Sequence, residues 1–453
     1  MQVSDTEFDL IVLGGGSGGL AAAFRAAEHG ARVAVLEPGE LGGTCVNLGC
    51  VPKKAMWLAA ELAQRIEMGC RMGFNVSQPK LDWREFVVHR QRYIAGIHDS
   101  YRKRLDSHGV VRVPSYGRLI GEGRVETQDG LRLSAPHIVI ATGSRPTRPP
   151  VPGAELGGVS DDFFNLCDAP ERVAIVGGGY IAVELASVLQ ALGSRVDLFV
   201  RGARLLESFD AELSAALADN LRQVGVRGRF GYRLGAVEAR GQGVRLVAED
   251  GTCSEHYDLL LFATGRQANT EGLGLEAAGV AANETGAIEV DDYQNTSASG
   301  IYAIGDVTGK VPLTPVAIAA ARRLMNRVFG GQADAKLDYR DIPTVVFAHP
   351  PLGRTGLSEE EARLQHGQGA VSVYRASFRP MLDALADTPM RSLFKLVCVG
   401  EDKRVVGLHL LGEGSDEMLQ GFAVAIKRGV TLDDLHDTVA IHPSSAEEVV
   451  LMR

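Results

Sequence analysis

Two cysteines five positions apart stand in the segment GGTCVNLGCVPKK, residues 42–54. Thiols at this spacing can act as a redox pair, as metal ligands or as packing residues. Zinc sites usually combine CxxC motifs or histidines, and neither accompanies Cys45 and Cys50. The run KKAMWLAAELAQRI that follows predicts a helix, whose dipole, together with Lys53 and Lys54, would lower a thiol pKa. An accessible thiol of low pKa suits disulfide exchange, so the sequence favours a redox pair.

A glycine-rich turn near the N-terminus, Gly14-x-Gly16-x-x-Gly19, lies between the apolar run FDLIVL and the alanine-rich run LAAAFRAAEHG. The order of strand, turn and helix, followed by the strand-like RVAVLE, predicts a βαβ unit. Such glycines let a pyrophosphate approach the N-terminus of the helix. Glu37 stands 18 residues after Gly19, where a carboxylate can bind ribose hydroxyls. The segment therefore predicts a dinucleotide-binding site.

The same plan recurs at residues 172–200, where Gly177-x-Gly179-x-x-Ala182 forms the second glycine-rich turn between a strand-like and a helical run. The chain thus carries two βαβ units of the nucleotide-binding type, a repeated module rather than a solenoid. Each unit predicts its own dinucleotide.

The residues after the second strand of this repeat bear on the choice of coenzyme. Eighteen residues after Ala182 stands Val200, which is not acidic, and Arg201 follows it, with Arg204 close by. A carboxylate at this place would favour NAD, whereas a neighbouring cation accommodates the 2′-phosphate of NADP. The sequence predicts NADPH and leaves NADH open.

Two dinucleotide sites and one cysteine pair together suggest a path for two electrons. NADPH would deliver a hydride, a flavin would relay it, and the dithiol would release two electrons to a substrate. A flavin is expected because nicotinamide transfers hydride poorly to sulfur directly, and the cofactor supplies that chemistry.

Two short segments mark where the chain crosses between domains. IVIATGSRP (138–146) and LLLFATGRQAN (259–269) share one plan and bracket the second βαβ unit, which predicts a domain inserted into the first. From about residue 339 the strand-like runs are typical of antiparallel strands, and a helical run accompanies them. This part therefore predicts an α+β domain. The predicted fold is α/β, with two Rossmann-like dinucleotide-binding domains and a C-terminal α+β domain. The predicted boundaries are 1–143 for the first part of the first dinucleotide-binding domain, 144–267 for the inserted second one, 268–338 for the second part of the first domain, and 339–453 for the α+β domain.

Composition narrows the class of protein. The formal net charge of −9 over 453 residues gives no reason to expect binding to nucleic acid or to an anionic membrane. No segment approaches about 20 uninterrupted apolar residues. Six cysteines are too few for a secreted disulfide scaffold, so we expect a cytoplasmic protein in which a disulfide is catalytic. No metal site is predicted.

At this point the chain resembles the flavin-dependent pyridine nucleotide–disulfide oxidoreductases, from about residue 7 to its C-terminus. GGTCVNLGCVPKK matches the redox motif of that family, and GGGYIAVE, GIYAIGD, LTPVAIAA, DEMLQGFAVA and TVAIHPSSAEE match further segments. The resemblance is strongest to members that reduce glutathione disulfide. It implies that residues 1–143 and 268–338 form an FAD/central domain, that 144–267 form an NAD(P)H domain, and that 339–453 form an interface (dimerisation) domain. It also implies a homodimer whose active sites are shared between subunits.

The resemblance also implies roles for single residues. Cys45 matches the thiol that attacks the substrate disulfide, and Cys50 matches the thiol beside the flavin. His442 resembles the acid–base group that reaches the disulfide from the partner subunit, with Glu447 orienting it. The remaining matches to catalytic positions are the ion pair near the flavin and the ring that gates it: Lys53, Glu184 and Tyr180.

Cofactor contacts follow from the two fingerprints and from the resemblance, in which Asp306 matches the acid near the ribityl or phosphate part of the flavin. The predicted cofactor-binding residues are Gly14, Gly16, Ser17, Gly19, Glu37, Gly43, Thr44, Lys54, Thr142, Gly143, Gly177, Gly179, Arg201, Arg204, Gly265, Asp306 and Thr314.

Two positions depart from the family pattern. Phe24 stands where several relatives carry an arginine that contacts glutathione, and Glu207 stands where NADP-specific relatives carry a second arginine. The main expectation is reduction of glutathione disulfide by NADPH. The alternative is the disulfide of glutathione amide or of another small thiol, with NADH as a possible coenzyme. The predicted substrate-binding residues are Ser17, Arg25, Tyr101 and Arg322.

Overall fold

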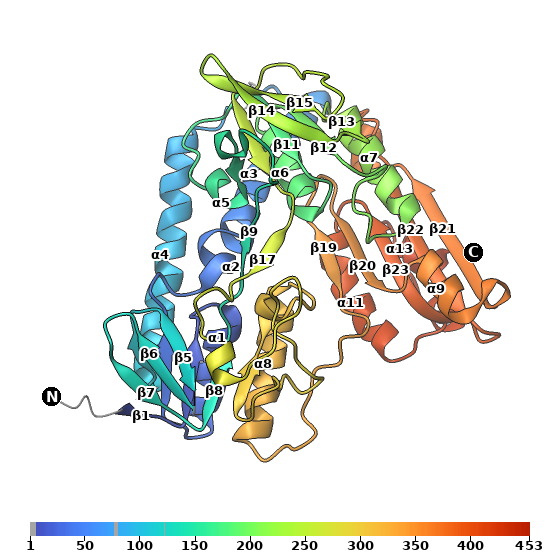
Figure 1. The fold of residues 1–453 in the computed structure, drawn as a ribbon. Coiled ribbons are helices and arrows are strands. Elements are labelled where there is room, and N and C mark those ends of the chain that lie inside the picture. Colours follow the sequence, from blue (N-terminus) through green and yellow to red (C-terminus); the bar gives the residue numbers. More distant parts are fainter. Residues whose placement is uncertain (1–5, 77–79, 122) are drawn as a thin grey trace. The chain divides into compact units, whose positions relative to one another are not determined.

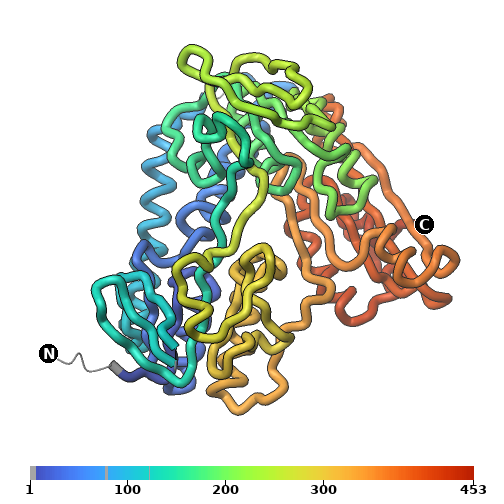
Figure 2. The backbone as a smooth tube through the Cα atoms, viewed as in Figure 1, coloured from blue at the N-terminus to red at the C-terminus, as the bar shows by residue number. Residues whose placement is uncertain are grey.

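The structure is a computed structural model that describes residues 6–76, 80–121 and 123–453. The chain divides into two compact units, and each is built from segments that are separate in the sequence. Figure 2 traces the backbone, which leaves unit 1 after Thr147 and returns to it at Gly265. Unit 1 comprises Met1–Lys53, Glu85–Thr147 and Gly265–Tyr339, and unit 2 comprises Lys54–Arg84, Arg148–Thr264 and Arg340–Arg453.

Unit 1 is built on a parallel five-stranded sheet with the order β18-β8-β2-β3-β4. Its strands are β2 (Leu10–Leu13), β3 (Val33–Leu36), β4 (Val111–Val113), β8 (His137–Ile140) and β18 (Ile301–Ala303). Every residue of β2 and β3 is buried, as expected for a parallel sheet that is covered on both faces. One face carries α1 (Ser17–Glu28) and α8 (Thr314–Val328), which pack together (Figure 1).

The other face of this sheet packs against a smaller four-stranded sheet with the order β1-β7-β6-β5. Its strands are β1 (Thr6–Glu7), β5 (Gly117–Gly121), β6 (Arg124–Thr127) and β7 (Arg132–Ser134). The two crossing segments of unit 1 pair as the antiparallel strands β9 (Ser144–Pro146) and β17 (Arg266–Ala268). Two short 3-10 helices complete the unit, η2 (Glu276–Ala278) and η3 (Gly305–Thr308).

Small residues let α1 and α8 pack closely. The run SGGLAAAFRAAE is rich in alanine, the best helix former, and α1 ends at Glu28, with His29 as its C-cap and Gly30 next in a left-handed conformation. A β-carbon on Gly18 would lie 3.3 Å from the methyl group of Ala317 on α8. This close packing against α8 fixes the position of α1, which begins directly after the first glycine-rich turn.

Three helices carry or flank the cysteines: α2 (Gly43–Asn47), α3 (Cys50–Arg71) and α4 (Trp83–Ser107). The sequence predicted a helix directly after the pair. In the structure Cys45 lies inside the short α2, and Cys50 is itself the first residue of α3.

Unit 2 contains a second parallel five-stranded sheet, with the order β10-β16-β11-β12-β13. Its strands are β10 (Gly158–Val159), β11 (Arg172–Val176), β12 (Arg195–Val200), β13 (Arg227–Phe230) and β16 (Leu259–Phe262). The helices of this part are η1 (Ala154–Leu156), α5 (Ser160–Phe163), α6 (Tyr180–Ala191) and α7 (Ala211–Gln223). An antiparallel hairpin of β14 (Leu234–Arg240) and β15 (Gly243–Ala248) packs on the core of the sheet.

The C-terminal part of unit 2 is an antiparallel sheet with the order β19-β20-β23-β22-β21. Its strands are β19 (Thr344–Val346), β20 (Leu352–Gly356), β21 (Val371–Phe378), β22 (Ser392–Val399) and β23 (Arg404–Leu411). The helices are α9 (Glu359–His366), η4 (Gln368–Ala370), α10 (Met381–Leu385), α11 (Ser415–Lys427), α12 (Leu432–Asp437) and α13 (Glu447–Leu451). The α11, α12 and α13 helices share one apolar core with this sheet.

The predicted fold class is confirmed by these elements. Each glycine-rich turn joins the first strand of a parallel βαβ unit to its helix, and the C-terminal sheet with its helices forms the α+β part. Across residues 6–76, 80–121 and 123–453, no helix is long and apolar enough to cross a membrane.

Candidate active site

The first glycine-rich turn forms an open cradle at the start of α1. Gly16 caps the helix without a side chain, so the first backbone N–H groups of α1 donate no hydrogen bond to a capping side chain. Gly43, at the start of α2, approaches this point so closely that a β-carbon on it would lie 2.8 Å from the Cα of Gly16. The bare helix terminus and close backbones fit a pyrophosphate, which needs N–H donors and no obstructing side chains.

Glu37 is fixed beside the cradle. Its Oε2 accepts a hydrogen bond of 2.7 Å from the backbone N–H of Gly15, and its Oε1 accepts one of 2.9 Å from that of Gly39. The carboxylate therefore lies at the end of β3 next to the turn, where the sequence predicted a ribose contact.

The crossing segments bring further predicted cofactor residues together in unit 1. Thr142 donates a hydrogen bond of 2.7 Å to the carbonyl oxygen of Asn269, and Ser144 donates one of 2.8 Å to Asp306. Arg266 donates to the hydroxyl of Ser144 over 2.8 Å. Gly143 and Gly265 flank these contacts in conformations of positive φ. Asp306 is thus held by the strands that leave and re-enter unit 1.

The two cysteines of the motif are neighbours, and both are free thiols. The thiol of Cys45 interacts with Cys50, Thr314 and Ser17, and the Sγ of Cys50 lies 3.6 Å from the Oγ1 of Thr314 at the start of α8. Thr44 belongs to α2, as Cys45 does. The motif, the first turn and α8 therefore meet at one place.

The expectation of a low thiol pKa is wrong for Cys45. The hydrogen bond with Cys50 raises the pKa of the Cys45 thiol well above its ordinary value, and burial raises it further. The sequence argument counted helix dipoles and lysines but not the neighbouring sulfur and the loss of water. Lys54 is also engaged elsewhere in unit 2, because its Nζ lies 3.2 Å from Asp416 and 3.7 Å from the ring centroid of Trp57.

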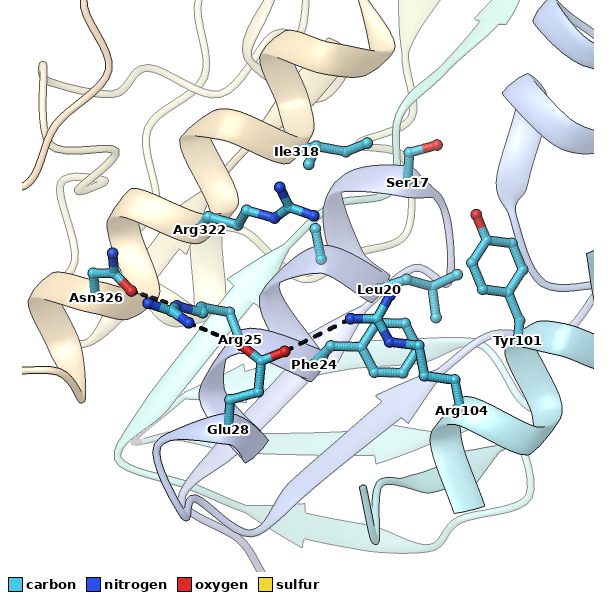
Figure 3. A pocket seen from close by; sticks show the side chains of 11 residues that line it. Ser17, Leu20, Phe24, Arg25, Glu28, Tyr101, Arg104, Ile318, Arg322 and Asn326 are labelled. Atoms are coloured by element: carbon cyan, nitrogen blue, oxygen red, sulfur yellow. Dashed lines mark hydrogen bonds and ion pairs between the residues drawn. The ribbon is translucent and has the colours of Figure 1, made fainter. Parts of the chain in front are cut away.

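A cavity of about 310 Å³ opens along α1, beside the cysteines. Ser17, which contacts Cys45, lines it, and so does Tyr101 of α4. Burial raises the pKa of Tyr101, and the nearby Cys45 adds to this rise. Figure 3 shows the lining side chains, which come from α1, α4 and α8: Ser17, Leu20, Ala21, Phe24, Arg25, Glu28, Tyr101, Arg104, Ile318, Arg322 and Asn326. All four predicted substrate residues are in this set.

The cavity is rich in cations. Arg25 donates a hydrogen bond of 2.5 Å to Asn326 and one of 2.9 Å to Glu28. The hydrogen bond from Arg25 holds the pKa of Glu28 below its ordinary value. The guanidinium of Arg104 lies 4.2 Å from the ring centroid of Phe24 and 3.6 Å from Glu28 (Figure 3). Arg322 also lines the cavity, so its wall holds three arginines and one acid.

Sequence reasoning missed Glu28, Arg104 and Asn326. A signal existed for Arg104, since it follows Tyr101 by three residues on the predicted helix and so shares its face. Glu28 lies three residues after Arg25, and Asn326 four after Arg322, by the same rule.

The second glycine-rich turn lies in unit 2, between β11 and α6. Gly179 caps α6 without a side chain, as Gly16 caps α1. Tyr180 is the first residue of α6 and is 39% exposed, so its ring is accessible. Gly177 has a positive φ of 146° and brings the turn close to Ala263.

The segment after β12 differs from its prediction in detail. Arg201 is exposed, but Arg204 donates a hydrogen bond of 2.7 Å to the carbonyl oxygen of Glu207. The carboxylate of Glu207 lies on Gly202, so close that a β-carbon on Gly202 would overlap it. The carboxylate therefore occupies the surface next to Arg201.

This segment is held from the C-terminal sheet of unit 2. Arg354 of β20 donates a hydrogen bond to the carbonyl oxygen of Ser208, and Lys395 of β22 binds Asp210 at 2.9 Å. Asp210 in turn caps α7 by accepting from the backbone N–H of Glu212. These contacts fix the end of the segment next to Glu207.

Glu184 is buried in α6 and accepts a hydrogen bond of 2.8 Å from the backbone N–H of Phe347. Lys53 lies in the first turn of α3. Their ion pair stays a prediction. His349, in the segment HPP, is buried against Trp57, and burial lowers its pKa to about 4, which suits a packing role. No group of three His, Cys, Asp or Glu side chains that could hold a metal occurs among the described residues.

His442 and Glu447 form a pair in unit 2. The Nδ1 of His442 lies 2.9 Å from the Oε2 of Glu447, and this hydrogen bond lowers the pKa of the carboxyl group. The side chain of His442 is 79% exposed. Val439 and Ile441 beside it are 91% and 76% exposed. Exposed apolar side chains around a fixed histidine are typical of a surface that another chain covers.

Comparison with known proteins agrees with this geometry. The family profile described as "Pyridine nucleotide-disulphide oxidoreductase" matches residues 8–321, and the profile described as its "dimerisation domain" matches residues 342–453. The chain is 43% identical over 470 residues to "Glutathione reductase" of Yarrowia lipolytica, covering 100% of both chains. It is 44% identical over 456 residues to "Glutathione reductase" of Schizosaccharomyces pombe, covering 98% of both.

Solved structures of similar fold include the HOCl-induced flavoprotein disulfide reductase RclA from Escherichia coli. Its copper(II) complex superposes with a TM-score of 0.88 at 27% identity, over 98% of each chain. A second structure of the same protein gives a TM-score of 0.86 at 27% identity, over 97% of this chain and 98% of that one. With two glycine-rich turns, a thiol pair and a family profile that spans most of its length, the chain belongs to the pyridine nucleotide–disulphide oxidoreductases.

Proposed function

We propose that the protein is a glutathione reductase, which converts glutathione disulfide, NADPH and a proton into two glutathiones and NADP⁺. The observation that carries this function is the cation-rich cavity that shares Ser17 with the thiol of Cys45, in a chain similar to two glutathione reductases over its whole length. Similarity of this extent favours glutathione disulfide over the amide alternative.

FAD and NADPH are the cofactors of this reaction. We assign residues 1–143 and 268–338 to the FAD domain and residues 144–267 to the NADPH domain. The bare N-terminus of α1, with Glu37 fixed beside it, suits FAD, and the second turn with Arg201 suits NADPH. FAD, when bound, supplies the transfer of two electrons from NADPH to the disulfide.

The two thiols divide the work on the substrate. The sulfur of Cys45, as thiolate, attacks one sulfur of glutathione disulfide, which forms a mixed disulfide and expels one glutathione thiolate. The thiolate of Cys50 then attacks the Cys45 sulfur, which releases the second glutathione and leaves a Cys45–Cys50 disulfide. The contact of Cys45 with Ser17 of the cavity supports the assignment of Cys45 to the substrate side.

His442 supplies the proton for the leaving thiolate. Glu447 keeps the imidazole oriented through its hydrogen bond to Nδ1. The hydrogen bond with Cys50 and burial raise the pKa of Cys45, so a base beside this thiol would help it to become a nucleophile. We assign residues 339–453 to the interface domain of a homodimer, in which His442 serves the cysteines of the partner subunit. The exposed Val439 and Ile441 support this arrangement. A cytoplasmic location completes the proposal, in keeping with a working dithiol.

Steady-state oxidation of NADPH by the purified holoenzyme tests the function. We expect turnover that depends on glutathione disulfide, and a loss of at least about 10⁴-fold in Cys45→Ser with FAD retained. A wild type whose rate of NADPH oxidation does not increase when glutathione disulfide is added would refute the proposal.

Mixing inactive subunits tests the sharing of active sites. Heterodimers of Cys45→Ser and His442→Ala are expected to regain up to half of the wild-type activity per heterodimer, since one of the two sites then holds both intact groups. Absence of recovery, with heterodimers verified by mass, would contradict a shared site.

A further inference from the structure

We propose that Arg104 of α4 binds a carboxylate of the substrate and so selects a charged end of glutathione disulfide. This inference rests on the proposed function, because glutathione disulfide is taken as the ligand of the cavity. Each half of that molecule carries a glycine carboxylate and the α-carboxylate of its γ-glutamyl group. The cavity must therefore present cations whose hydrogen-bond donors are still available.

Arg25 and Arg104 differ in this respect. Arg25 uses its Nε on Asn326 at 2.5 Å and its Nη1 on Glu28 at 2.9 Å. In the part of the chain that the structure describes, no residue accepts a hydrogen bond from the guanidinium of Arg104. Its ion pair with Glu28, at 3.6 Å, is too long for one. Arg104 therefore has more donors free for a ligand than Arg25 has.

The ring of Phe24 presents this guanidinium to the cavity. The Cζ of Arg104 lies 4.2 Å from the ring centroid, within the range of a cation–π contact. One planar face is thereby covered by an aromatic ring, and the edge that carries the N–H groups stays available for a bidentate carboxylate. Phe24 is 3% exposed, so this support is fixed by the core.

The position of Arg104 along the cavity fits the length of the substrate. The wall formed by α1 runs from Ser17, next to Cys45, to Phe24, next to Arg104. Seven residues of helix span about 10 Å at about 1.5 Å per residue. A chain of two to three residues reaches about 7–10 Å, so a terminal carboxylate of a glutathione half can meet Arg104 while its sulfur lies at Cys45.

Substitution of Arg104 tests the proposal. Arg104→Met keeps the apolar stem on Phe24 and removes the charge, and Arg104→Lys keeps a charge without the planar fork. Because a hydrogen bond to a charged group contributes about 1.5–3 kcal/mol, we expect KM for glutathione disulfide to rise about 10- to 100-fold in Arg104→Met. The kcat and the KM for NADPH stay within about twofold, and Arg104→Lys recovers part of the loss.

Arg102→Met is the matched control. Arg102 lies on the same helix with a similarly exposed side chain, 43% against 45% for Arg104, and pairs with Asp99 and Glu40 rather than lining the cavity. Its KM is expected to equal that of the wild type. A KM for Arg104→Met that matches this control would overturn the proposal.

The disulfide of glutathione amide identifies which carboxylate Arg104 binds. The amide lacks only the charge of the glycine end. If Arg104 binds that end, wild type prefers the acid form and Arg104→Met loses the preference. If Arg104 binds the γ-glutamyl end, both substrates lose the same factor in Arg104→Met. A wild type without activity on either substrate would instead count against the proposed function itself.

Discussion

The two glycine-rich turns follow one sequence pattern but differ in how much room they leave. In the first turn a β-carbon on Gly19 would overlap the carbonyl oxygen of Gly14. In the second turn the same position is Ala182, whose methyl group is accommodated and fully buried. A β-carbon on Gly179 would meet nothing within 4 Å. The shared glycine pattern therefore places a strand, a turn and a helix in the same order in both units. The two turns nevertheless differ in the space that they leave for a β-carbon.

The acidic residues near the turns differ as well. Glu37 is held by two backbone N–H groups at the end of β3, which fixes it for a neutral ribose hydroxyl. At the end of β12 the matching position is the buried Val200, and the carboxylate of Glu207 lies on Gly202 two residues further on. A site built for a 2′-phosphate would need cations here, and Arg201 shares the surface with a negative charge.

The largest effect is expected from Gly19→Ala, which adds to the first turn the methyl group that the second turn accommodates at Ala182. Gly19→Ala forces a β-carbon onto the oxygen of Gly14, and overpacking of this kind costs at least about 1–3 kcal/mol. We expect loss of bound FAD and a lower Tm, measured by the ratio of flavin to protein absorbance and by thermal unfolding. The reverse change, Ala182→Gly, costs only about 1 kcal/mol, the usual price of glycine in a helix. Stoichiometric FAD in Gly19→Ala would show that the turns do not differ.

An intermediate effect is expected at the cation of the second turn. Arg201→Met removes a charge-assisted contact with the 2′-phosphate, which contributes about 1.5–3 kcal/mol. The kcat/KM for NADPH should fall about 10- to 100-fold, and that for NADH should change little, as measured by initial rates with each coenzyme. Arg222→Met, an exposed arginine on α7, serves as the control. Equal losses with both coenzymes would assign Arg201 a structural role.

The smallest effect is expected at Glu207. Its exposed carboxylate repels a phosphate on the neighbouring surface by about 0.5–1 kcal/mol, the scale of exposed charge pairs. Glu207→Gln should therefore raise kcat/KM for NADPH about two- to fivefold and leave that for NADH unchanged or lower. Because the repulsion is screened, the gain should shrink in about 1 M salt. A gain that is the same for both coenzymes would contradict this reading.

The sequence allowed the fold to be predicted where the signal is local. The buried runs LIVL and VAVL and the spacing from Gly19 to Glu37 depend on neighbours in one βαβ unit, and the structure has β2, β3 and the carboxylate as expected. The resemblance placed Ser17, Arg25, Tyr101 and Arg322, and all four line one cavity.

Other features depend on contacts between distant segments and could not be read from the chain. Lys54, the second lysine of the motif, forms an ion pair with Asp416, which stands 362 residues later in the sequence. Cys50 raises the pKa of Cys45, and so does burial, which depends on elements from elsewhere in the chain such as Thr314 at the start of α8. Arg104 on α4 stacks on Phe24 on α1, so this contact joins two helices. From the sequence Phe24 was interpreted as the loss of an arginine, but in the structure its ring holds the guanidinium of Arg104.

The cavity of three arginines lies in a chain of net charge −9, and this contrast bears on how substrate arrives. Glutathione disulfide has more carboxylates than amines and is an anion, so the field of the whole molecule repels it at long range, while the arginines attract it nearby. Dissolved salt weakens most strongly the electrostatic interactions between charges that are further apart than the Debye length of about 8–10 Å. Moderate ionic strength should thus remove more of the distant repulsion than of the local attraction, and encounter with substrate should be faster in a salty solution than in a dilute buffer.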